Sequence, residues 1–258
     1  MPQLTKQQVA LGLPLLIAAI VWSSSLSSEF TGYDDIKLIV DNEHAKQGLW
    51  HSLRFFWDTY SGSFNTAWSD FPTIIYRPLE QYGIALGYKL WGASPWHFHF
   101  FFNFLLHLLN SALVFFIIKK FIKGDILPAC ICAIWAVHPL HHEAVNLLTS
   151  GTGFMLAHSL GLAAIAINLY SKNPISFALA GALFFVALLG SEMIVLLIPI
   201  LAILIYKQED FLLKINPLNA ALILYLIKRS SIVSSNVEMN SFELVERTFV
   251  LAPQILLN

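Results

Sequence analysis

The chain has 258 residues, of which 57% are hydrophobic and only 12% are charged, and its mean hydropathy is +0.65. Soluble domains carry about 25% charged residues, so this composition excludes an ordinary soluble domain. The formal net charge is −1, and the sequence has no basic stripe and no glycine-rich phosphate loop, which argues against a nucleic-acid partner.

Apolar segments recur along the chain and approach or reach the roughly 20 residues that a helix needs to cross a bilayer. The clear segments, in chain order, cover residues 9–26, 98–118, 126–137, 154–170, 175–189 and 193–206. Two weaker segments cover residues 218–227 and 249–257. The sequence therefore predicts an all-α, polytopic transmembrane helix bundle with about six to eight membrane helices. It gives no sign of a second domain, so we expect one transmembrane domain over residues 1–258.

The first apolar segment follows Lys6, as in a secretory signal peptide. Because further membrane segments follow it, we expect a retained signal anchor rather than a cleaved signal. Cys130 and Cys132 lie two residues apart on a predicted helix and point to different faces, so we expect no structural disulfide between them.

Charge is distributed unevenly between the connections of the predicted helices. With a cytoplasmic N-terminus and one crossing per clear segment, residues 119–125, 171–174 and 207–217 lie inside and are rich in lysine. Short cytoplasmic loops carry an excess of Lys and Arg, which supports this orientation. Residues 28–97 and 138–153 then face the outer or luminal side of a bacterial inner membrane or an endoplasmic reticulum membrane.

The long external segment, residues 28–97, contains two predicted helices. Residues 45–60 carry large apolar side chains at helical spacing, which predicts an amphipathic helix in the lipid headgroup region or, alternatively, a cover over the outer mouth of the bundle. Residues 61–72 read as a loop. Residues 79–91 predict an interfacial or short re-entrant helix, with Pro78 in its first turn.

Asp34 and Asp35 follow the first apolar segment almost at once. A carboxylate at the edge of a bilayer costs free energy unless it is paired or functional. Two adjacent carboxylates repel each other, which raises the pKa of one of them. Such a group is suited to act as a general base toward a hydroxyl. The structural alternative is a solvated loop pair that caps a helix.

A second cluster of polar residues comprises His138, His141, His142 and Glu143. Their spacing places several of them together on a helix, so one alternative is a site for a divalent metal ion. No His-Glu-x-x-His pattern is present, however, and Pro139 disturbs the helical turn, so we expect no metal there. The other functional alternative is that the imidazoles and Glu143 form hydrogen bonds to an anionic ligand or an acceptor at the membrane edge.

Polar residues also occur within the membrane segments. His99, Asn103 and His107 are spaced by four, with Asn110 near the same stripe, and interhelical hydrogen bonding accounts for such a ridge without a ligand. We expect His158 to have a structural role as well.

Arg77 and Glu192 are charged residues on the predicted outer side. A guanidinium binds phosphate through two hydrogen bonds, so Arg77 is a candidate phosphate clamp. Glu192 begins a membrane helix and suits the helix dipole there, or alternatively pairs with Arg77 or a substrate. The predicted outer-side cluster thus consists of Asp34, Asp35, Arg77, His138, His141, His142, Glu143 and Glu192.

Several motifs follow the aspartate pair in a recognisable order. They cover residues 76–79 (YRPL), 95–107 (PWHFHFFFNFLLH), 136–145 (AVHPLHHEAV), 149–151 (TSG) and 191–193 (SEM). In this order they resemble the membrane part of the transmembrane and tetratricopeptide-repeat O-mannosyltransferase family, which belongs to the GT-C glycosyltransferases. The resemblance covers residues 30–257, and we expect the chain to correspond to the N-terminal part of such a protein.

The resemblance implies a GT-C-like fold and transfer of a sugar from a polyprenyl-phosphate carrier, the lipid-linked sugar donor, to a hydroxyl of a protein or glycan. An acidic residue of the first external loop is the catalytic base in that family, so Asp34 or Asp35 is expected to have this role. Arg77, His138 and Glu143 are expected to shape the donor and acceptor site. Membrane lipids and other membrane subunits are the further expected partners.

The chain also departs from the family pattern. Thr152 and Gly153 stand where family members usually have Arg and an acid, and Ser191 stands where they usually have Lys. These departures leave open a non-catalytic GT-C-like protein that serves as a structural or assembly subunit of a membrane complex. A metal-binding membrane protein that uses His138 and its neighbours is the third alternative.

Overall fold

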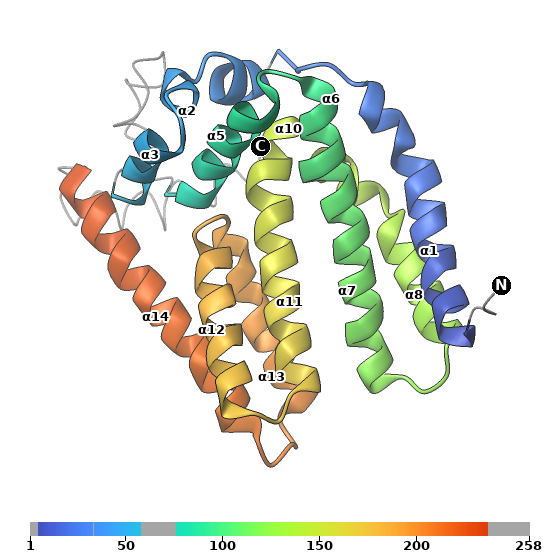
Figure 1. Cartoon of the computed structure of the whole chain (residues 1–258). Coiled ribbons are helices and arrows are strands. Elements are labelled where there is room, and N and C mark those ends of the chain that lie inside the picture. The colour runs from blue at the N-terminus through green and yellow to red at the C-terminus, as the bar shows by residue number, and fades with distance from the viewer. Residues whose placement is uncertain (1–4, 33, 58–75, 237–258) are drawn as a thin grey trace, which may run out of the picture.

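The computed structural model describes residues 5–32, 34–57 and 76–236. Every regular element in these ranges is a helix, which confirms the predicted all-α bundle (Figure 1). Helices that are long and apolar enough to cross a membrane cover Lys6–Ser27, Pro95–Phe121, Leu148–Tyr170 and Phe211–Val233. Shorter apolar helices cover Ile126–Ala136, Pro174–Leu188 and Glu192–Ile205. The chain is therefore a membrane protein.

The membrane elements follow the predicted segments closely. The first comprises α1 (Lys6–Trp22) and η1 (Ser23–Ser27), and the second comprises α6 (Pro95–Phe98), η4 (His99–Phe104) and α7 (Leu105–Phe121). Next come α8 (Ile126–Ala136), then α10 (Leu148–Ser150), η6 (Gly151–Met155) and α11 (Leu156–Tyr170). The last are α12 (Pro174–Leu188), η7 (Glu192–Leu196), α13 (Leu197–Ile205) and α14 (Phe211–Asn236).

The weak segment at residues 218–227 is the middle of α14, a helix of 26 residues. Pro217 lies inside this helix, and polar residues at both of its ends dilute the apolar pattern, so the sequence shows only its centre. The second weak segment, residues 249–257, lies outside the described residues, as does the predicted loop at 61–72.

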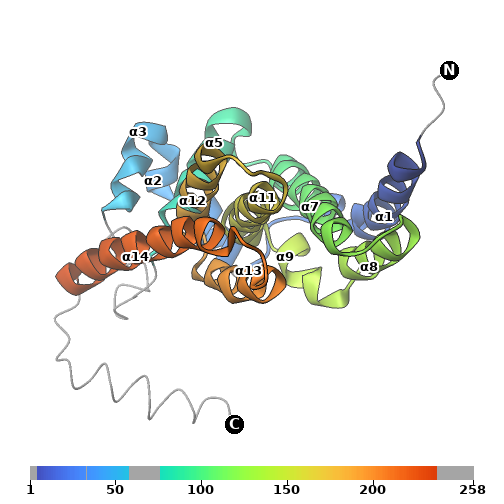
Figure 2. The same cartoon turned by 90° about the horizontal axis from the view of Figure 1, so that it is seen from below.

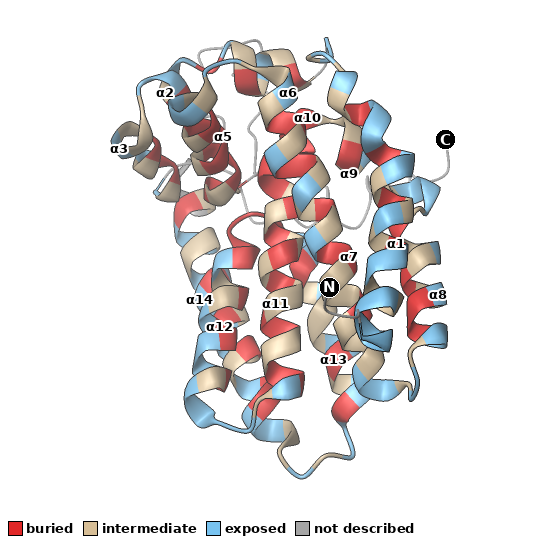
Figure 3. Cartoon of the chain, turned by 45° about the vertical axis from the view of Figure 1, so that its right-hand side comes forward, coloured by how far each residue is buried: buried red, intermediate tan, exposed pale blue. Residues whose placement is uncertain are grey.

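The helices stand side by side in a bundle (Figures 1 and 2). Helix α11 packs between α7 and α12, α1 and α8 flank α7, and α14 lies against α12. The largest buried cluster joins α11, α12, α13 and α14 and includes Phe184, Leu188 and Leu201. Large apolar side chains such as Ile20, Ile134 and Ile203 are exposed on outward faces (Figure 3). Such faces suit contact with lipid.

The connections 122–125, 171–173 and 206–210 lie at one end of the bundle, near the N-terminus of the chain (Figure 1). The segments that follow α1 lie at the other end. They include η2 (Ile36–Val40), α2 (Glu43–Lys46), α3 (Leu49–Ser52), η3 (Leu53–Phe56) and α5 (Pro78–Trp91). This grouping is the arrangement expected for helices that each cross once.

The predicted single amphipathic helix at residues 45–60 is wrong. Gly48 has φ +99° and separates α2 from α3, because this left-handed conformation ends a helix and favours glycine. Residues 58–60 lie outside the described part. The helix predicted at residues 79–91 is confirmed as α5, which begins at Pro78 and ends at Gly92, where φ is +63°.

The contact between α12 and α14 depends on Gly181. A Cβ atom at this position would lie 2.9 Å from both the carbonyl oxygen and the Cβ of Pro217. We therefore expect Gly181→Ala to destabilise the fold by about 1–3 kcal/mol, because the α14 backbone must move. Thermal unfolding in detergent measures the change. Gly12→Ala in α1 is the matched control, since it meets nothing within 4 Å, and an equal loss in both variants would contradict the close packing.

Candidate functional site

Asp35 is fully buried and forms part of the scaffold of the external segment. Its Oδ2 accepts hydrogen bonds from the backbone N–H of Thr31 (3.1 Å) and from the Thr31 hydroxyl (2.9 Å). Its Oδ1 accepts a hydrogen bond from the backbone N–H of Thr149 (3.0 Å), at the start of α10. The carboxylate thus ties the loop after α1 to a helix that lies more than a hundred residues further along the chain.

Asp34 is different, because its side chain is half-buried and no hydrogen bond to its carboxylate occurs among the described residues. Burial raises the pKa of Asp34, and the neighbouring carboxylates of Asp35 and Glu143 raise it further, while Lys37 opposes them. A carboxyl group with a raised pKa takes up a proton more readily than an ordinary aspartate. Of the two aspartates, Asp34 has the environment of a general base.

A cavity of about 260 Å³ lies between α7, α8, α9 (His142–Asn146) and α11. Its polar and aromatic lining includes His107, Asn110, His141, Glu143, Phe154 and His158. Burial lowers the pKa of His141 to about 4, and the neighbouring imidazoles of His107, His138 and His158 add to the effect. His141 is therefore a neutral hydrogen-bonding group at pH 7. Glu143, which lines the cavity, also raises the pKa of Asp34, so the two carboxylates interact electrostatically.

Arg77 and Glu192 form a bidentate ion pair. Arg77 Nε donates to Glu192 Oε2 at 3.0 Å, and Arg77 Nη2 donates to Glu192 Oε1 at 2.7 Å. The Arg77 guanidinium also lies 4.8 Å from the ring centre of Phe154, which lines the cavity. The alternative in which Glu192 pairs with Arg77 is thus the observed one. The Glu192 carboxylate occupies the edge of the guanidinium that is formed by Nε and Nη2.

His138 and His142 lie outside the cavity lining. His138 is exposed, and its Nδ1 accepts a hydrogen bond from the backbone N–H of Leu140 (3.2 Å), which closes the turn η5 (Pro139–His141). His142 is exposed at the first position of α9. Within the described ranges, no group of three or more His, Cys, Asp or Glu side chains is arranged to hold a metal ion.

The polar ridge of the second membrane element makes the predicted hydrogen bonds to other elements. Asn103 Nδ2 donates to the carbonyl oxygens of Ala144 (2.9 Å) and Leu147 (2.8 Å). His107 Nε2 lies 2.7 Å from the carbonyl oxygen of Ala136, and Asn110 Nδ2 donates to that of Met155 at 3.4 Å. His107 and Asn110 also line the cavity, as does His158. Helical spacing identified their common face, but only the packing of α8, α9 and α11 shows that this face borders a cavity.

Glu80 lies close to Gly153, the position at which the family pattern has an acidic residue. A Cβ atom on Gly153 would lie 3.0 Å from the carboxyl group of Glu80, a buried residue of α5. A carboxylate from the external helix therefore fills the space where the family pattern has an acidic side chain. The buried hydroxyl of Thr152 donates to the carbonyl oxygen of Thr149 at 3.0 Å, so it supplies no positive charge.

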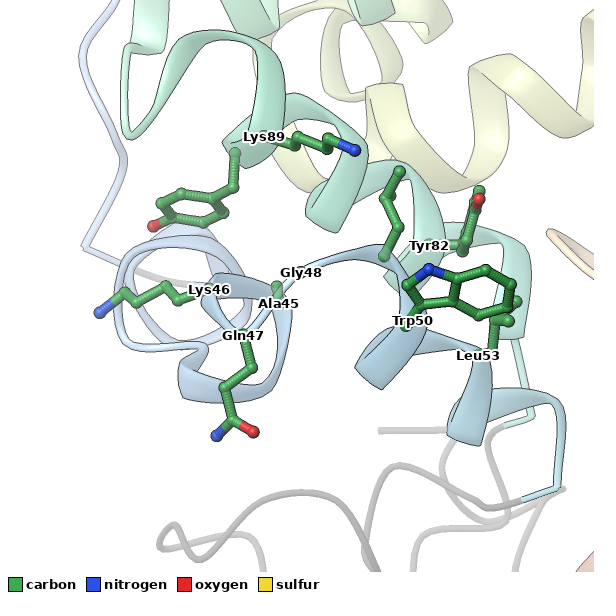
Figure 4. A pocket seen from close by; sticks show the side chains of 10 residues that line it. Ala45, Lys46, Gln47, Gly48, Trp50, Leu53, Tyr82 and Lys89 are labelled. Carbon is green, nitrogen blue, oxygen red and sulfur yellow. The ribbon is translucent and has the colours of Figure 1, made fainter.

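A second hollow of about 650 Å³ lies between the α2–α3 turn and α5 (Figure 4). Trp50, Tyr82, Lys46 and Gln47 are among the residues that line it. None of the predicted site residues lines it. The exposed Trp50 fits the expected contact of this segment with a membrane surface.

Sequence comparison relates the chain to the TMTC O-mannosyltransferases. It is 28% identical over 136 residues, or 50% of the chain, to Protein O-mannosyl-transferase tmtc2 of Xenopus laevis. It is 28% identical over 166 residues, or 62% of the chain, to Protein O-mannosyl-transferase TMTC3 of Homo sapiens. It is 30% identical over 136 residues, or 50% of the chain, to Protein O-mannosyl-transferase TMTC1 of Homo sapiens.

The matched regions make up only 15%, 17% and 14% of those three relatives. No protein-family model matches the chain, and no solved structure matches it. The chain is thus TMTC-like over about half its length, and its relatives are named as glycosyltransferases.

Proposed function

We propose that the chain forms the membrane part of a GT-C-type glycosyltransferase, which moves a hexose, mannose in the named relatives, from a polyprenyl-phosphate carrier to a hydroxyl of a protein or glycan. One observation carries the proposal. Asp34 interacts electrostatically with Glu143, Arg77 lies against Phe154, and both Glu143 and Phe154 line the same cavity. Inverting transfer needs a base on one side of the anomeric carbon and a phosphate-binding group on the other.

In the proposed reaction, Asp34 takes the proton of the acceptor hydroxyl as its oxygen attacks the anomeric carbon. The bond between that carbon and the carrier phosphate oxygen breaks, and the phosphate leaves with the electron pair. Arg77 stabilises the leaving phosphate through its guanidinium N–H groups. Asp35 keeps the loop in place. His138 and His142 lie outside the cavity lining and have no assigned step. The positive-inside pattern supports a site on the outer or luminal side of the membrane.

Membranes that contain the chain, polyprenyl-phosphate mannose labelled in the sugar and a hydroxyl acceptor test the proposal. We expect the label to pass to the acceptor, and not to do so in membranes without the chain. No transfer by a chain that is shown to be folded would contradict the proposal.

A second function, as a structural or assembly subunit of a membrane complex, is favoured by one observation. Arg77 is already held by Glu192, and Thr152 supplies no replacement charge. On that reading the chain co-purifies with a fixed membrane partner, and Asp34→Asn leaves the complex and its function unchanged.

The proposal also predicts how the rate depends on pH. Because Asp34 must be ionised to accept a proton and its pKa is raised, transfer should fall on acidification already above about pH 4, the ordinary aspartate value. Glu143→Gln removes a negative neighbour and should lower the pKa of Asp34, so the acidic limb should move to lower pH. A pH–rate profile for both proteins measures this shift, and an unchanged or upward-shifted limb would contradict the role of Asp34.

A further inference from the structure

Two lysines at the end of the bundle near the N-terminus are neutralised within the chain. Lys119, in the last turn of α7, pairs with Asp125 and donates to the carbonyl oxygen of Gly124 at 2.8 Å. Lys214, in α14, is buried and pairs with Asp210 at 2.9 Å. These contacts tie the connections to the helices beside them, so both lysines have a structural role.

A second group of lysines at the same end has no carboxylate partner. Its members are Lys120, Lys123, Lys172 and Lys207. All of them are exposed, and none forms an ion pair within the described ranges. Because Asp125 and Asp210 are already paired, Glu209 is the one remaining carboxylate of the connections 122–125, 171–173 and 206–210. This surface is therefore positively charged.

Three of these lysines belong to the adjoining ends of α7 and α11, which pack side by side (Figure 2). The Tyr170 hydroxyl, at the end of α11, donates to the carbonyl oxygen of Phe116 in α7 at 2.8 Å, which holds the ring against α7. Lys120 Nζ lies 5.0 Å from the centre of this ring. Lys123 and Lys172 lie in the connections that follow α7 and α11. Contact with a ring face leaves the ammonium group charged and able to bind an anion.

Large apolar side chains are exposed beside these connections. Phe121 ends α7, Ile126 begins α8 and Ile175 lies in the first turn of α12, and all of them are exposed. A small soluble anion makes no use of such apolar surface. A lipid with a charged headgroup and acyl chains complements both the ammonium groups and the apolar side chains.

We propose that Lys120, Lys123 and Lys172 form a binding site for the phosphate group of an anionic phospholipid, whose acyl chains contact the neighbouring exposed apolar side chains. The orientation predicted from the lysine-rich connections puts this site in the cytoplasmic leaflet, where anionic lipids attract basic segments next to membrane helices. The site lies at the opposite end of the bundle from Asp34 and Arg77 and does not depend on the proposed sugar transfer.

Native mass spectrometry of the purified full chain tests the proposal, in titrations with phosphatidylglycerol and with phosphatidylcholine of the same acyl chains. We expect phosphatidylglycerol to bind at least about tenfold more tightly, because its headgroup has a net negative charge. The triple variant Lys120→Gln, Lys123→Gln and Lys172→Gln should lose this preference, since each lysine near the headgroup strengthens binding about fivefold. Lys123→Gln alone should weaken the binding of phosphatidylglycerol about fivefold, and it keeps the test valid if the triple variant does not fold.

The matched control is the triple variant Lys37→Gln, Lys46→Gln and Lys89→Gln. These lysines lie in η2, α2 and α5, at the other end of the bundle, so the control changes the net charge by the same amount. It should keep the preference for phosphatidylglycerol. Thermal unfolding in detergent identifies any variant that fails to fold and also measures the stabilisation by each lipid and by inorganic phosphate.

Three results would overturn the proposal. The first is equal binding of the two lipids by the unchanged chain, or an unchanged preference in the folded site variants. The second is an equal loss of the preference in both triple variants, which would show a response to net charge rather than a site. The third is an increase of the thermal midpoint by inorganic phosphate as large as that by phosphatidylglycerol, which would indicate a site for free anions.

Discussion

Replacing Asp34 with Asn is expected to reduce sugar transfer by about 10²–10⁴-fold, the usual contribution of a general base. The amide has nearly the same shape but does not take up the acceptor proton. The fold should be retained, because the Asp34 side chain is half-buried and forms no hydrogen bond to its carboxylate among the described residues. The initial rate of label transfer per folded molecule measures the effect.

Asp41→Asn is the matched control for this prediction. Asp41 is an exposed aspartate on the same external segment, and its replacement should leave the rate unchanged. Equal rates for Asp34→Asn and the unchanged chain would show that Asp34 is not the base.

Replacing Asp35 with Ala is expected to act on stability rather than on the chemical step. The variant loses three hydrogen bonds from a fully buried carboxylate and leaves the Thr149 N–H without its partner. Hydrogen bonds to charged groups contribute about 1.5–3 kcal/mol each, so we expect a loss of at least about 2 kcal/mol. A lowered thermal midpoint in detergent would measure this loss.

Two further variants calibrate the effect of Asp35. Thr31→Val removes only the hydroxyl that donates to Asp35 and should cost less, about 1 kcal/mol. Glu43→Ala removes an exposed carboxylate on the same segment and should leave the midpoint unchanged. A stable Asp35→Ala protein that has lost transfer, beside an active Asp34→Asn protein, would reverse the two roles.

The fold was largely predictable from the sequence because hydropathy is a local property. Each clear apolar segment became a helix, since an uninterrupted apolar run long enough to cross a bilayer satisfies its backbone only as a helix. The prediction of a single helix over residues 45–60 was wrong for an equally local reason. Its apolar spacing continues across Gly48, but the backbone there adopts φ +99° and the helix ends. The spacing of the apolar residues alone therefore did not predict the break at Gly48.

The site was predictable only in part, because it depends on which elements pack together. The shared position of Asp34, Glu143, Arg77 and Glu192 at one end of the bundle followed from the alternation of helices. The different roles of Asp34 and Asp35 could not be predicted in this way. The structural role of Asp35 depends on its hydrogen bond with Thr149, which lies 114 residues further along the chain. The interhelical role expected of the polar ridge holds for Asn103, His107 and Asn110. The sequence did not predict that His107 and Asn110 also line a cavity.

The roles of the predicted site residues in catalysis stay predictions, and so do the sugar donor and the acceptor. The structure adds a constraint that the motifs did not contain. In the structure, the edge of the Arg77 guanidinium formed by Nε and Nη2 is occupied by Glu192. A guanidinium has five N–H donors, so in the proposed reaction a carrier phosphate either replaces Glu192 at this edge or binds the other edge.

The most direct test of the central claim is the release of polyprenyl phosphate from polyprenyl-phosphate mannose by the purified, folded chain in nanodiscs with a hydroxyl acceptor. The proposed glycosyltransferase releases one polyprenyl phosphate for each mannose that appears on the acceptor, and Asp34→Asn slows both together. A folded chain that releases no carrier phosphate, or that releases it equally fast with Asn at position 34, would contradict the account.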